Sequence, residues 1–177
     1  MAWKNRESLL QHPLGILPLG RVEGEMIKAV AGAFAGEIGM PLRVMPGLES
    51  PDYAFDRHRI QYDAARIITR IESMDLAGCA RVLALVDVDL FVPVFTFVFG
   101  EARLGGRVAL VSLFRLEDRP ERAVKIALHE FGHLCMLDHC RESRCVMHFA
   151  KGLGHLDRVA PYYCRYCLGQ VTYMAGV

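Results

Sequence analysis

Residues 129–140 read His-Glu-Phe-Gly-His-Leu-Cys-Met-Leu-Asp-His-Cys, and this stretch decides how we interpret the rest of the sequence. It begins with the pattern His-Glu-x-x-His. On a helix, residues four apart lie on one face, roughly 6 Å from each other, so His129 and His133 can share one metal ion. Glu130 lies about 100° around the helix from His129, which places it where it can act on a water molecule at that metal.

His139 can join the two other histidines only if the helix ends before it. Ten residues of continuous helix rise about 15 Å, whereas a zinc–nitrogen bond is about 2.0–2.1 Å long. We therefore expect the helix to stop near residues 136–138 and the chain to turn back. The acidic residues 117–118 followed by Pro120 predict where this helix begins.

A second group of candidate ligands follows directly. Cys140, Cys145, Cys164 and Cys167 form the spacings C-x4-C and C-x2-C, with 18 residues between the two pairs. Short paired spacings without a secretion signal favour a four-cysteine zinc site over disulfides, and a closed shell of four thiolates is structural. The simpler alternative is that these four residues are unrelated buried thiols. For Cys79 and Cys135, which lie outside the two pairs, a buried thiol in the core is the expected role. Because Cys140 follows His139, the structural zinc would help to hold His139 in place.

The composition is that of a globular protein. The chain has 177 residues, of which 53% are hydrophobic and 23% charged, which argues against disorder. We expect one domain, 1–177, with an N-terminal part (1–138) ending in the metal-binding helix and a C-terminal part (139–177) holding the four cysteines. The net charge of +1 gives no indication of nucleic acid as a partner.

Targeting and membrane signals are also weak. Residues 1–7 are polar and lack the layout of a signal peptide. The most apolar run, 82–99, contains Asp87 and Asp89, each of which would cost roughly 2.5–3.5 kcal/mol at the centre of a bilayer. We expect a monomeric, cytoplasmic protein with no membrane or nucleic-acid partner.

The order of elements predicts an α/β fold. Apolar and β-branched runs predict strands, and apolar residues at helical spacing predict helices. The expected strands are 14–20, 40–45, 81–86, 94–100 and 107–114; the expected helices are 22–38, 61–74 and the metal-binding helix, with a loop over 46–59. The first strand, helix and strand suggest parallel pairing, and the aromatic run 94–100, preceded by Pro93, suggests an edge strand. The result is a twisted mixed sheet of about five strands with covering helices. We expect an irregular C-terminal part with one short helix near 156–166.

Several other polar residues are weaker candidates. Met147 is either a core methionine or the methionine of a turn beneath the histidines. His148 and His155 are possible extra ligands or substrate contacts but are expected to be ordinary turn or surface residues. The remaining candidates carry no clear signal: His12, His58, Asp87, Asp89, Glu101, Tyr53, Tyr62, Tyr162 and Tyr163. For the acids among them we expect solvated loop ends.

Taken together, the motif residues resemble the metzincin metallopeptidases, and among them the archaemetzincins. The metzincin pattern is H-E-x-x-H-x-x-G-x-x-H followed by a Met-turn; the archaemetzincin pattern adds the cysteines. The positions are filled here, in order, by His129, Glu130, His133, His139, Cys140, Cys145, Met147, Cys164 and Cys167. The gap between Met147 and Cys164 is 16 residues, against 17 in the family pattern.

The resemblance implies two zinc ions per chain. One would be catalytic, on His129, His133 and His139, with Glu130 as general base; the other would be structural, on the four cysteines. It also implies that Met147 is the Met-turn methionine and that the edge strand 94–100 borders a cleft in which an extended peptide binds as an added strand. Some family members are aminopeptidase-like, so peptides or proteins are the expected substrates.

One residue departs from the family pattern. Met136 stands where the pattern has Gly, a residue that tolerates the positive φ expected at the turn. A residue with a Cβ costs about 1–2 kcal/mol in that conformation. Either Met136 accepts this conformation or the turn uses other dihedral angles.

Two functions remain open at this point. The first is zinc-dependent peptide hydrolysis, in which zinc activates a water molecule and polarises the scissile carbonyl while Glu130 moves the proton. The alternative is a catalytically weak or inactive zinc-binding or peptide-binding module of the same fold. Nucleic-acid binding through the four cysteines fits poorly with the near-neutral charge.

Overall fold

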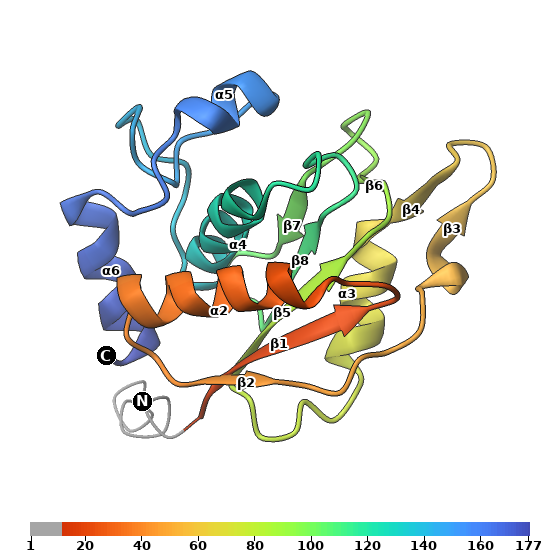
Figure 1. The fold of residues 1–177 in the computed structure, drawn as a ribbon, viewed down its shortest axis with the longest axis horizontal. Coiled ribbons are helices and arrows are strands. Elements are labelled where there is room, and N and C mark those ends of the chain that lie inside the picture. Colours follow the sequence, from red (N-terminus) through yellow and green to blue (C-terminus); the bar gives the residue numbers. More distant parts are fainter. Residues whose placement is uncertain (1–11) are drawn as a thin grey trace.

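A five-stranded mixed sheet forms the centre of the protein (Figure 1), as seen in a computed structural model that describes residues 12–177. The strand order is β2-β1-β5-β8-β7. The strands are β1 (Leu14–Leu19), β2 (Leu42–Val44), β5 (Arg81–Val86), β7 (Gly100–Ala102) and β8 (Val108–Ser112). All neighbours pair in parallel except β7, which runs antiparallel to β8 at the edge. The predicted α/β class and mixed sheet are confirmed.

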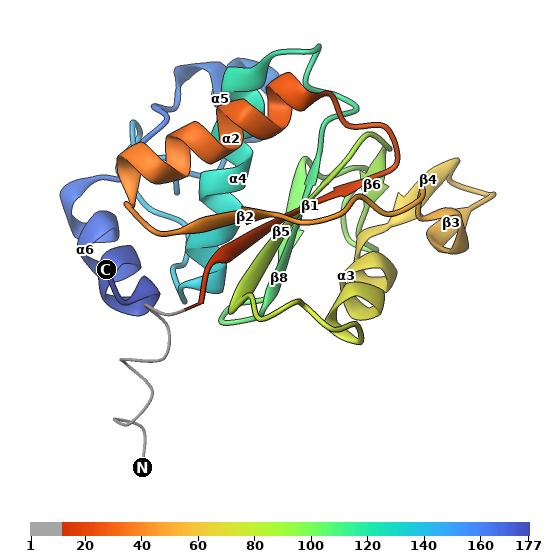
Figure 2. The same cartoon turned by 60° about the horizontal axis from the view of Figure 1, so that its bottom comes forward.

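Helices cover both faces of this sheet. Helices α2 (Gly24–Glu37) and α4 (Pro120–Leu134) lie on one face, and α3 (Ala64–Glu72) lies on the other (Figure 2). Two apolar cores result, one on each side, and alternate residues of β5 and β8 contribute to each. Because both faces are covered, β8 is buried along its whole length and β5 after its first residue, which explains their uninterrupted apolar sequences.

The first β-α-β unit is formed as predicted. β1 and β2 pair in parallel, with Leu14 opposite Leu42, and α2 connects them. The helix buries Met26, Val30 and Phe34 at helical spacing. It ends where the N–H of Gly39 donates to the carbonyl of Phe34, and Gly39 has a φ of 74°. A glycine fits this left-handed position at the end of a helix without steric cost.

The helix predicted over 61–74 begins later than expected. Residues Gln61–Asp63 form β4, which pairs with β3 (Phe55–Asp56) and β6 (Leu90–Phe91) in a separate three-stranded sheet. The side chain of Asp63 accepts from the N–H of Arg66, so it is the N-cap from which α3 starts. The predicted loop 46–59 also contains a short 3₁₀ helix, η1 (Asp52–Ala54), and β3.

The predicted edge strand over 94–100 is wrong in its position. The edge strand is β7, Gly100–Ala102, whereas residues 94–99 form turns and an isolated bridge between Leu90 and Val98. The physical reason is that the carbonyls of Phe95 and Thr96 accept hydrogen bonds from the side chains of Arg59 and Gln61 instead of from a neighbouring strand.

The C-terminal part contains more helix than expected. Instead of one short helix near 156–166 there are two, α5 (Leu153–Arg158) and α6 (Arg165–Ala175), with residues 159–164 between them. Helix α6 gives only a weak periodic signal in the sequence because just three of its residues, Cys167, Val171 and Ala175, are buried. These residues belong to the same apolar core as α2 and α4.

Long-range polar contacts attach α5 to α4. The guanidinium of Arg122 binds both carboxylate oxygens of Asp157, each at 2.8 Å. The ammonium of Lys125 donates to the carbonyl of Leu156 at 2.9 Å. Paired contacts of this kind fix the orientation of the short helix, which is too small to form by itself.

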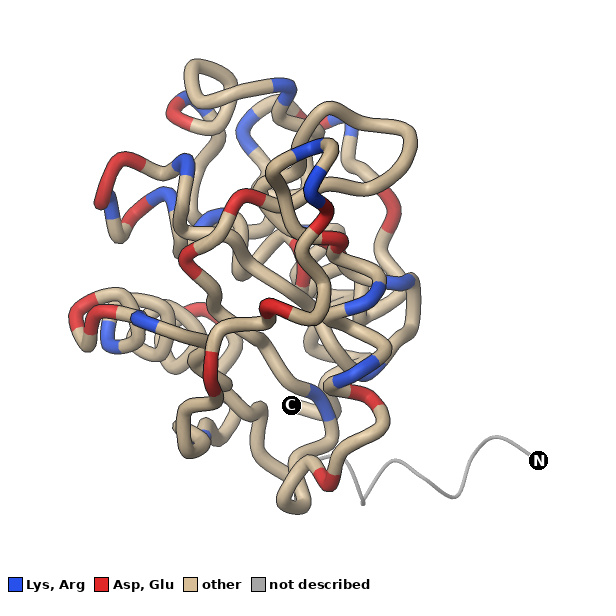
Figure 3. The backbone as a smooth tube through the Cα atoms, turned by 90° about the vertical axis from the view of Figure 1, so that its right-hand side faces the viewer, with Lys and Arg blue, Asp and Glu red and all other residues tan. Residues whose placement is uncertain are grey.

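Charges are dispersed over the molecule. Figure 3 shows Lys and Arg interspersed with Asp and Glu along the backbone. Within residues 12–177, no helix is long and apolar enough to cross a membrane. The polar segment 1–7 lies outside the described residues.

Candidate active site

Helix α4 ends in a tight turn that redirects the chain toward the histidines. The N–H of Met136 donates to the carbonyl of His133, and the N–H of Leu137 donates to the carbonyl of Gly132, both at 3.0 Å. This pair of bonds is a Schellman motif, and Met136 occupies its left-handed position with a φ of 64°. Met136 therefore accepts the strained conformation, and α4 ends at Leu134, two residues before the predicted range 136–138.

The turn brings three histidines together. Their ring centroids lie 4.8 Å apart for His129 and His133, 5.2 Å for His129 and His139, and 5.1 Å for His133 and His139. The Nε2 atoms of His129 and His133 are 3.1 Å apart. One nitrogen from each of the three rings lies within 4.8 Å of the others. Such a cluster is the geometry of ligands around one ion.

Backbone carbonyls orient two of these rings. Nδ1 of His129 lies 2.8 Å from the carbonyl oxygen of Val146, and Nδ1 of His133 lies 2.7 Å from that of Leu137. A carbonyl can only accept, so each Nδ1 carries the hydrogen and each Nε2 keeps its lone pair. A hydrogen bond of this kind orients a metal-binding histidine and fixes its tautomer.

Electrostatics keep the three imidazoles neutral. Burial, and then the neighbouring His133, lowers the pKa of His129 to about 3. Burial also lowers the pKa of His133 and of His139. Neutral imidazoles with free Nε2 atoms are the form that zinc binds, so the residues present fit the catalytic zinc.

Glu130 is buried beside the histidines, against the edge strand. A Cβ placed on Gly100 would lie 2.7 Å from both Cγ and Oε1 of Glu130, so only glycine at position 100 leaves room for this carboxyl group. Burial, and then the negative charge of Glu101, raises the pKa of Glu130. A zinc ion nearby has the opposite effect, because a positive charge favours the ionised carboxylate.

The four cysteines converge in the C-terminal part. Their Sγ atoms lie within 4.8 Å of one another, and those of Cys140 and Cys164 are 3.9 Å apart. Backbone N–H groups point at two of them: Glu142 donates to Cys140 and Cys164 donates to Cys145. All six cysteines are free thiols, and burial raises the pKa of Cys145. Four thiols gathered in this way without disulfides fit a structural zinc, since the metal is what stabilises adjacent thiolates.

One short segment connects the two groups of ligands. The carbonyl of Val146 binds His129, and the carbonyl of Met147 accepts from the N–H of Cys140 at 2.9 Å. Nδ1 of His148 donates to the carbonyl of Cys140 at 3.0 Å. Met147 is fully buried beneath α4, and a Cβ on Gly132 would lie 2.2 Å from its Sδ atom. The segment is thus packed against the helix that carries the histidines.

A cavity of about 300 Å³ lies in front of the histidines. Its walls come from residues 95–102 before and within β7, from the face of α4 that carries His129 and Glu130, and from the C-terminal part of the chain. The C-terminal part contributes residues 139, 146, 148–151, 156 and 159. This matches the expectation that the segment 94–100 borders the cleft, even though most of that segment is not a strand.

The weaker candidates separate clearly. His148 lines the cavity, whereas His155, His12 and His58 are exposed. Tyr163 is buried and donates its hydroxyl to the carbonyl of Leu128, and Asp87 is exposed. The expectation of a solvated loop end is wrong for Asp89, which is in an ion pair with Arg115, and for Glu101, which is half-buried in β7.

Sequence reasoning missed two residues at the site. Gly100 and Gly132 make room for Glu130 and Met147, and neither carries a functional group that a motif search would select. Gly132 does lie inside the H-E-x-x-H pattern, but at a position where the pattern allows any residue. An interior helical glycine costs about 0.5–1 kcal/mol relative to alanine, so its presence there is the available signal of a packing requirement.

Comparison with known proteins agrees with this geometry. Residues 21–172 match the model of peptidase family M54. The chain belongs to this family. An archaemetzincin of Methanocaldococcus jannaschii is 35% identical over 86% of this chain and 89% of its own length, and one of Aeropyrum pernix is 34% identical over 91% and 93%.

Solved structures show the same relationship for this M54 chain. The crystal structure of archaemetzincin from Methanopyrus kandleri superposes with a TM-score of 0.84, at 30% identity, and covers 98% of both chains. That from Archaeoglobus fulgidus, complexed with malonate, gives 0.79 at 31% identity and covers 89% of this chain and 99% of the other. The chain is a zinc metallopeptidase, and its two ligand clusters account for a catalytic and a structural zinc. The predicted family and the predicted enzyme class are confirmed.

Proposed function

We propose that this M54 chain hydrolyses peptide bonds at a zinc ion held by His129, His133 and His139, with Glu130 as the general base. The observation that carries the proposal is the placement of the Glu130 carboxyl group, buried against Gly100 and one residue from the first histidine. The three neutral imidazoles beside it supply the ligands that the metal requires.

The metal, Glu130 and two backbone carbonyls have separate roles in this mechanism. A zinc ion held by the three histidines would supply Lewis-acid chemistry, because such an ion lowers the pKa of a bound water and polarises a carbonyl. Glu130 accepts the proton of the attacking water and delivers it to the leaving nitrogen. The carbonyls of Val146 and Leu137 hold His129 and His133 in the orientation that keeps Nε2 toward the metal.

We propose that the peptide binds in an extended form along β7. The carbonyl of Phe99 accepts from the N–H of Ser112, so the main-chain groups of residues 99 and 101 face β8. Those of Gly100 and Ala102 then face the open side of the edge strand, which lines the cavity. A substrate strand can pair with them, as in other cases of β-augmentation.

We also propose that Cys140, Cys145, Cys164 and Cys167 hold the structural zinc and that Met147 is the Met-turn methionine. The whole chain would act as one domain, because residues of the C-terminal part share the apolar core of α2 and α4. The contacts of residues 146–148 support a direct mechanical link between the two metals. A monomeric state and a cytoplasmic location stay predictions from the sequence.

Replacing Glu130 tests the mechanism. Glu130→Gln keeps the shape of the side chain but removes the base, so peptide cleavage should fall by at least about 100-fold. Zinc content should stay at two per chain, because Glu130 is not a ligand. Zinc analysis and kinetics with a library of fluorogenic peptides measure the two effects.

Glu121 offers a matched control on the same helix. It is 59% exposed in the first turn of α4, far along the helix from the histidines. Glu121→Gln should leave both cleavage and zinc content unchanged. Full cleavage by the Glu130→Gln variant would refute the assigned role of Glu130.

A further inference from the structure

One wall of the cavity is an irregular segment rich in aromatic side chains. We call Phe95–Phe99 the aromatic rim; all five of its residues line the cavity. The rings of Phe97 and Phe99 pack edge to face with centroids 5.3 Å apart, and Phe95 is 49% exposed. Since the rim is not part of a regular strand, something other than a β-ladder must hold it in place.

Each residue of the rim makes a specific contact that fixes it. The N–H of Phe95 donates to the carbonyl of Val92, and the N–H of Val98 donates to that of Leu90, both at 3.0 Å. The carbonyl of Phe99 accepts from Ser112. All three contacts are between backbone atoms. That of Phe95 closes a local turn, whereas those of Val98 and Phe99 tie the end of the rim to β6 and β8.

The middle of the rim is held by side chains instead. Arg59 donates to the carbonyl of Phe95 at 2.7 Å, and Gln61 donates to that of Thr96 at 2.9 Å. The guanidinium of Arg115 lies over the ring of Phe97, 4.1 Å from its centroid. Polar and cation–π contacts therefore replace the missing strand partner.

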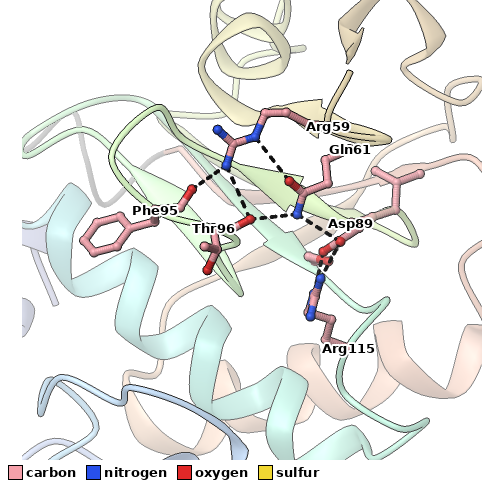
Figure 4. A network of polar contacts seen from close by, with 8 residues as sticks. Arg59, Gln61, Asp89, Phe95, Thr96 and Arg115 are labelled. Carbon is pink, nitrogen blue, oxygen red and sulfur yellow. Dashed lines mark hydrogen bonds and ion pairs between the residues drawn. The ribbon is translucent and has the colours of Figure 1, made fainter. Parts of the chain in front are cut away.

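A single carboxylate organises two of these three side chains (Figure 4). Asp89 accepts from Nε and Nη2 of Arg115, each at 2.6 Å, and from Nε2 of Gln61 at 3.0 Å. Its side chain is only 12% exposed. Figure 4 shows the Phe95 ring pointing away from this network. Asp89 and its partners thus contact the rim on the side opposite to the exposed ring of Phe95.

We propose that Asp89 is a positioning residue for substrate binding: through Arg115 and Gln61 it holds the aromatic rim in the position in which it lines the cleft. The proposal rests on the proposed function, since it takes the cavity as the peptide site. A wall that is already in place does not have to be ordered when the peptide binds, and pre-organisation of this kind improves affinity. Asp89 touches neither the peptide nor the metal, so its effect should appear in peptide affinity and not in the chemical step.

The charge of Asp89 is what the arrangement needs. A carboxylate accepts the bidentate fork of Arg115 and the amide of Gln61 at the same time. An amide at position 89 has one acceptor oxygen and would direct a donor N–H toward Arg115 or Gln61. Asp89→Asn should therefore release the rim while it preserves the volume of the side chain.

The main test is steady-state kinetics of Asp89→Asn with a peptide that the parent enzyme cleaves. We expect KM to rise about tenfold while kcat stays within about twofold, the pattern of lost uniform binding. Zinc content should remain at two per chain. The inhibition constant of acetohydroxamate, a metal-binding probe too small to reach the rim, should also be unchanged. Hydrogen exchange of the amides of residues 95–99 should become faster.

A second ion pair provides the matched control. Arg103 binds Glu72 at 2.6 Å and links the segment after β7 to α3, without contact to the rim. Glu72→Gln removes a carboxylate that also binds an arginine but lies at the end of α3. It should leave KM, kcat and exchange at residues 95–99 at their parent values.

Arg59→Met keeps the proposal testable if Asp89→Asn does not fold. Arg59 is exposed, so its replacement should not unfold the chain. It removes one donor to the rim, and we expect a smaller rise in KM, about threefold, with kcat unchanged.

Two results would overturn the proposal. One is an unchanged KM in Asp89→Asn, or in Arg59→Met if only that variant folds. The other is an equal loss of acetohydroxamate binding or zinc, which would place the effect at the metal centre. A failure of the proposed function is recognised separately, because it would show as retained cleavage in Glu130→Gln.

Discussion

The two groups of metal ligands lie next to each other in the chain but are held by different means. His129 and His133 project from α4, whose buried apolar face packs against the sheet. Backbone carbonyls orient the two imidazole rings. The four cysteines come from loops and from the start of α6. The histidine site is thus shaped by the fold around it, whereas the cysteine site must itself shape the segment that contains it. Loss of the two metals should therefore have unequal consequences for stability.

The largest expected effect comes from comparing a cysteine with a histidine. Cys145→Ser should remove the structural zinc and lower the free energy of unfolding by at least about 3 kcal/mol, since metal binding is coupled to folding in such segments. The catalytic zinc should also bind more weakly, because Val146 and Cys140 would lose their fixed positions. Zinc content and urea unfolding measure both effects.

His129→Ala is the counterpart on the helix. It should lower the zinc content from two to one but leave most of the stability, because the core around α4 is apolar. If the two variants lost equal stability, the contrast between the sites would be wrong.

Gly132→Ala tests the contact that joins the two regions. The added Cβ would overlap Sδ of Met147, at 2.2 Å, and overpacking of this kind costs about 1–3 kcal/mol. Displacement of Met147 should also disturb Val146 and so weaken zinc binding by His129. Thermal unfolding and zinc affinity report the two consequences.

Gly32 is the matched control for this prediction. It lies in α2, where an added Cβ would meet nothing within 4 Å. Gly32→Ala should stabilise the protein by about 0.5–1 kcal/mol, through helix propensity alone. Destabilisation by both alanines would mean that the contact with Met147 is not the cause.

The smallest effect is expected at Met136. Met136→Gly removes the strain of a left-handed residue with a Cβ, at φ 64°, and should stabilise the helix end by about 1 kcal/mol. Zinc binding by His139 should not weaken, because the two hydrogen bonds of the turn involve only the backbone. Chemical denaturation of the holoenzyme measures the gain; a loss would indicate that packing of Met136 on Gly105 matters more.

Much of the fold could be predicted because local patterns of apolar residues indicate the strands and helices. The apolar runs of β5 and β8 and the helical spacing in α2 each report a buried face, and the structure confirms them. The edge strand is predicted several residues too early, because the composition of residues 94–100 suits a strand. In the structure, the carbonyls of Phe95 and Thr96 instead accept hydrogen bonds from the side chains of Arg59 and Gln61. No pattern within 94–100 reveals those distant partners.

The candidate ligands and the candidate base are already visible in the amino-acid sequence. Ligand types and spacings over 129–167 predict both zinc sites, since a helix places residues four apart on one face and paired cysteines need only short loops. Their surroundings are visible only in the folded protein: the carbonyls that orient His129 and His133, the space that Gly100 leaves for Glu130, and the contacts of Asp89 behind the cleft. Apart from the pair His133 and Leu137, those features join residues far apart in the chain. The distance in space between two such residues is set by packing rather than by local periodicity.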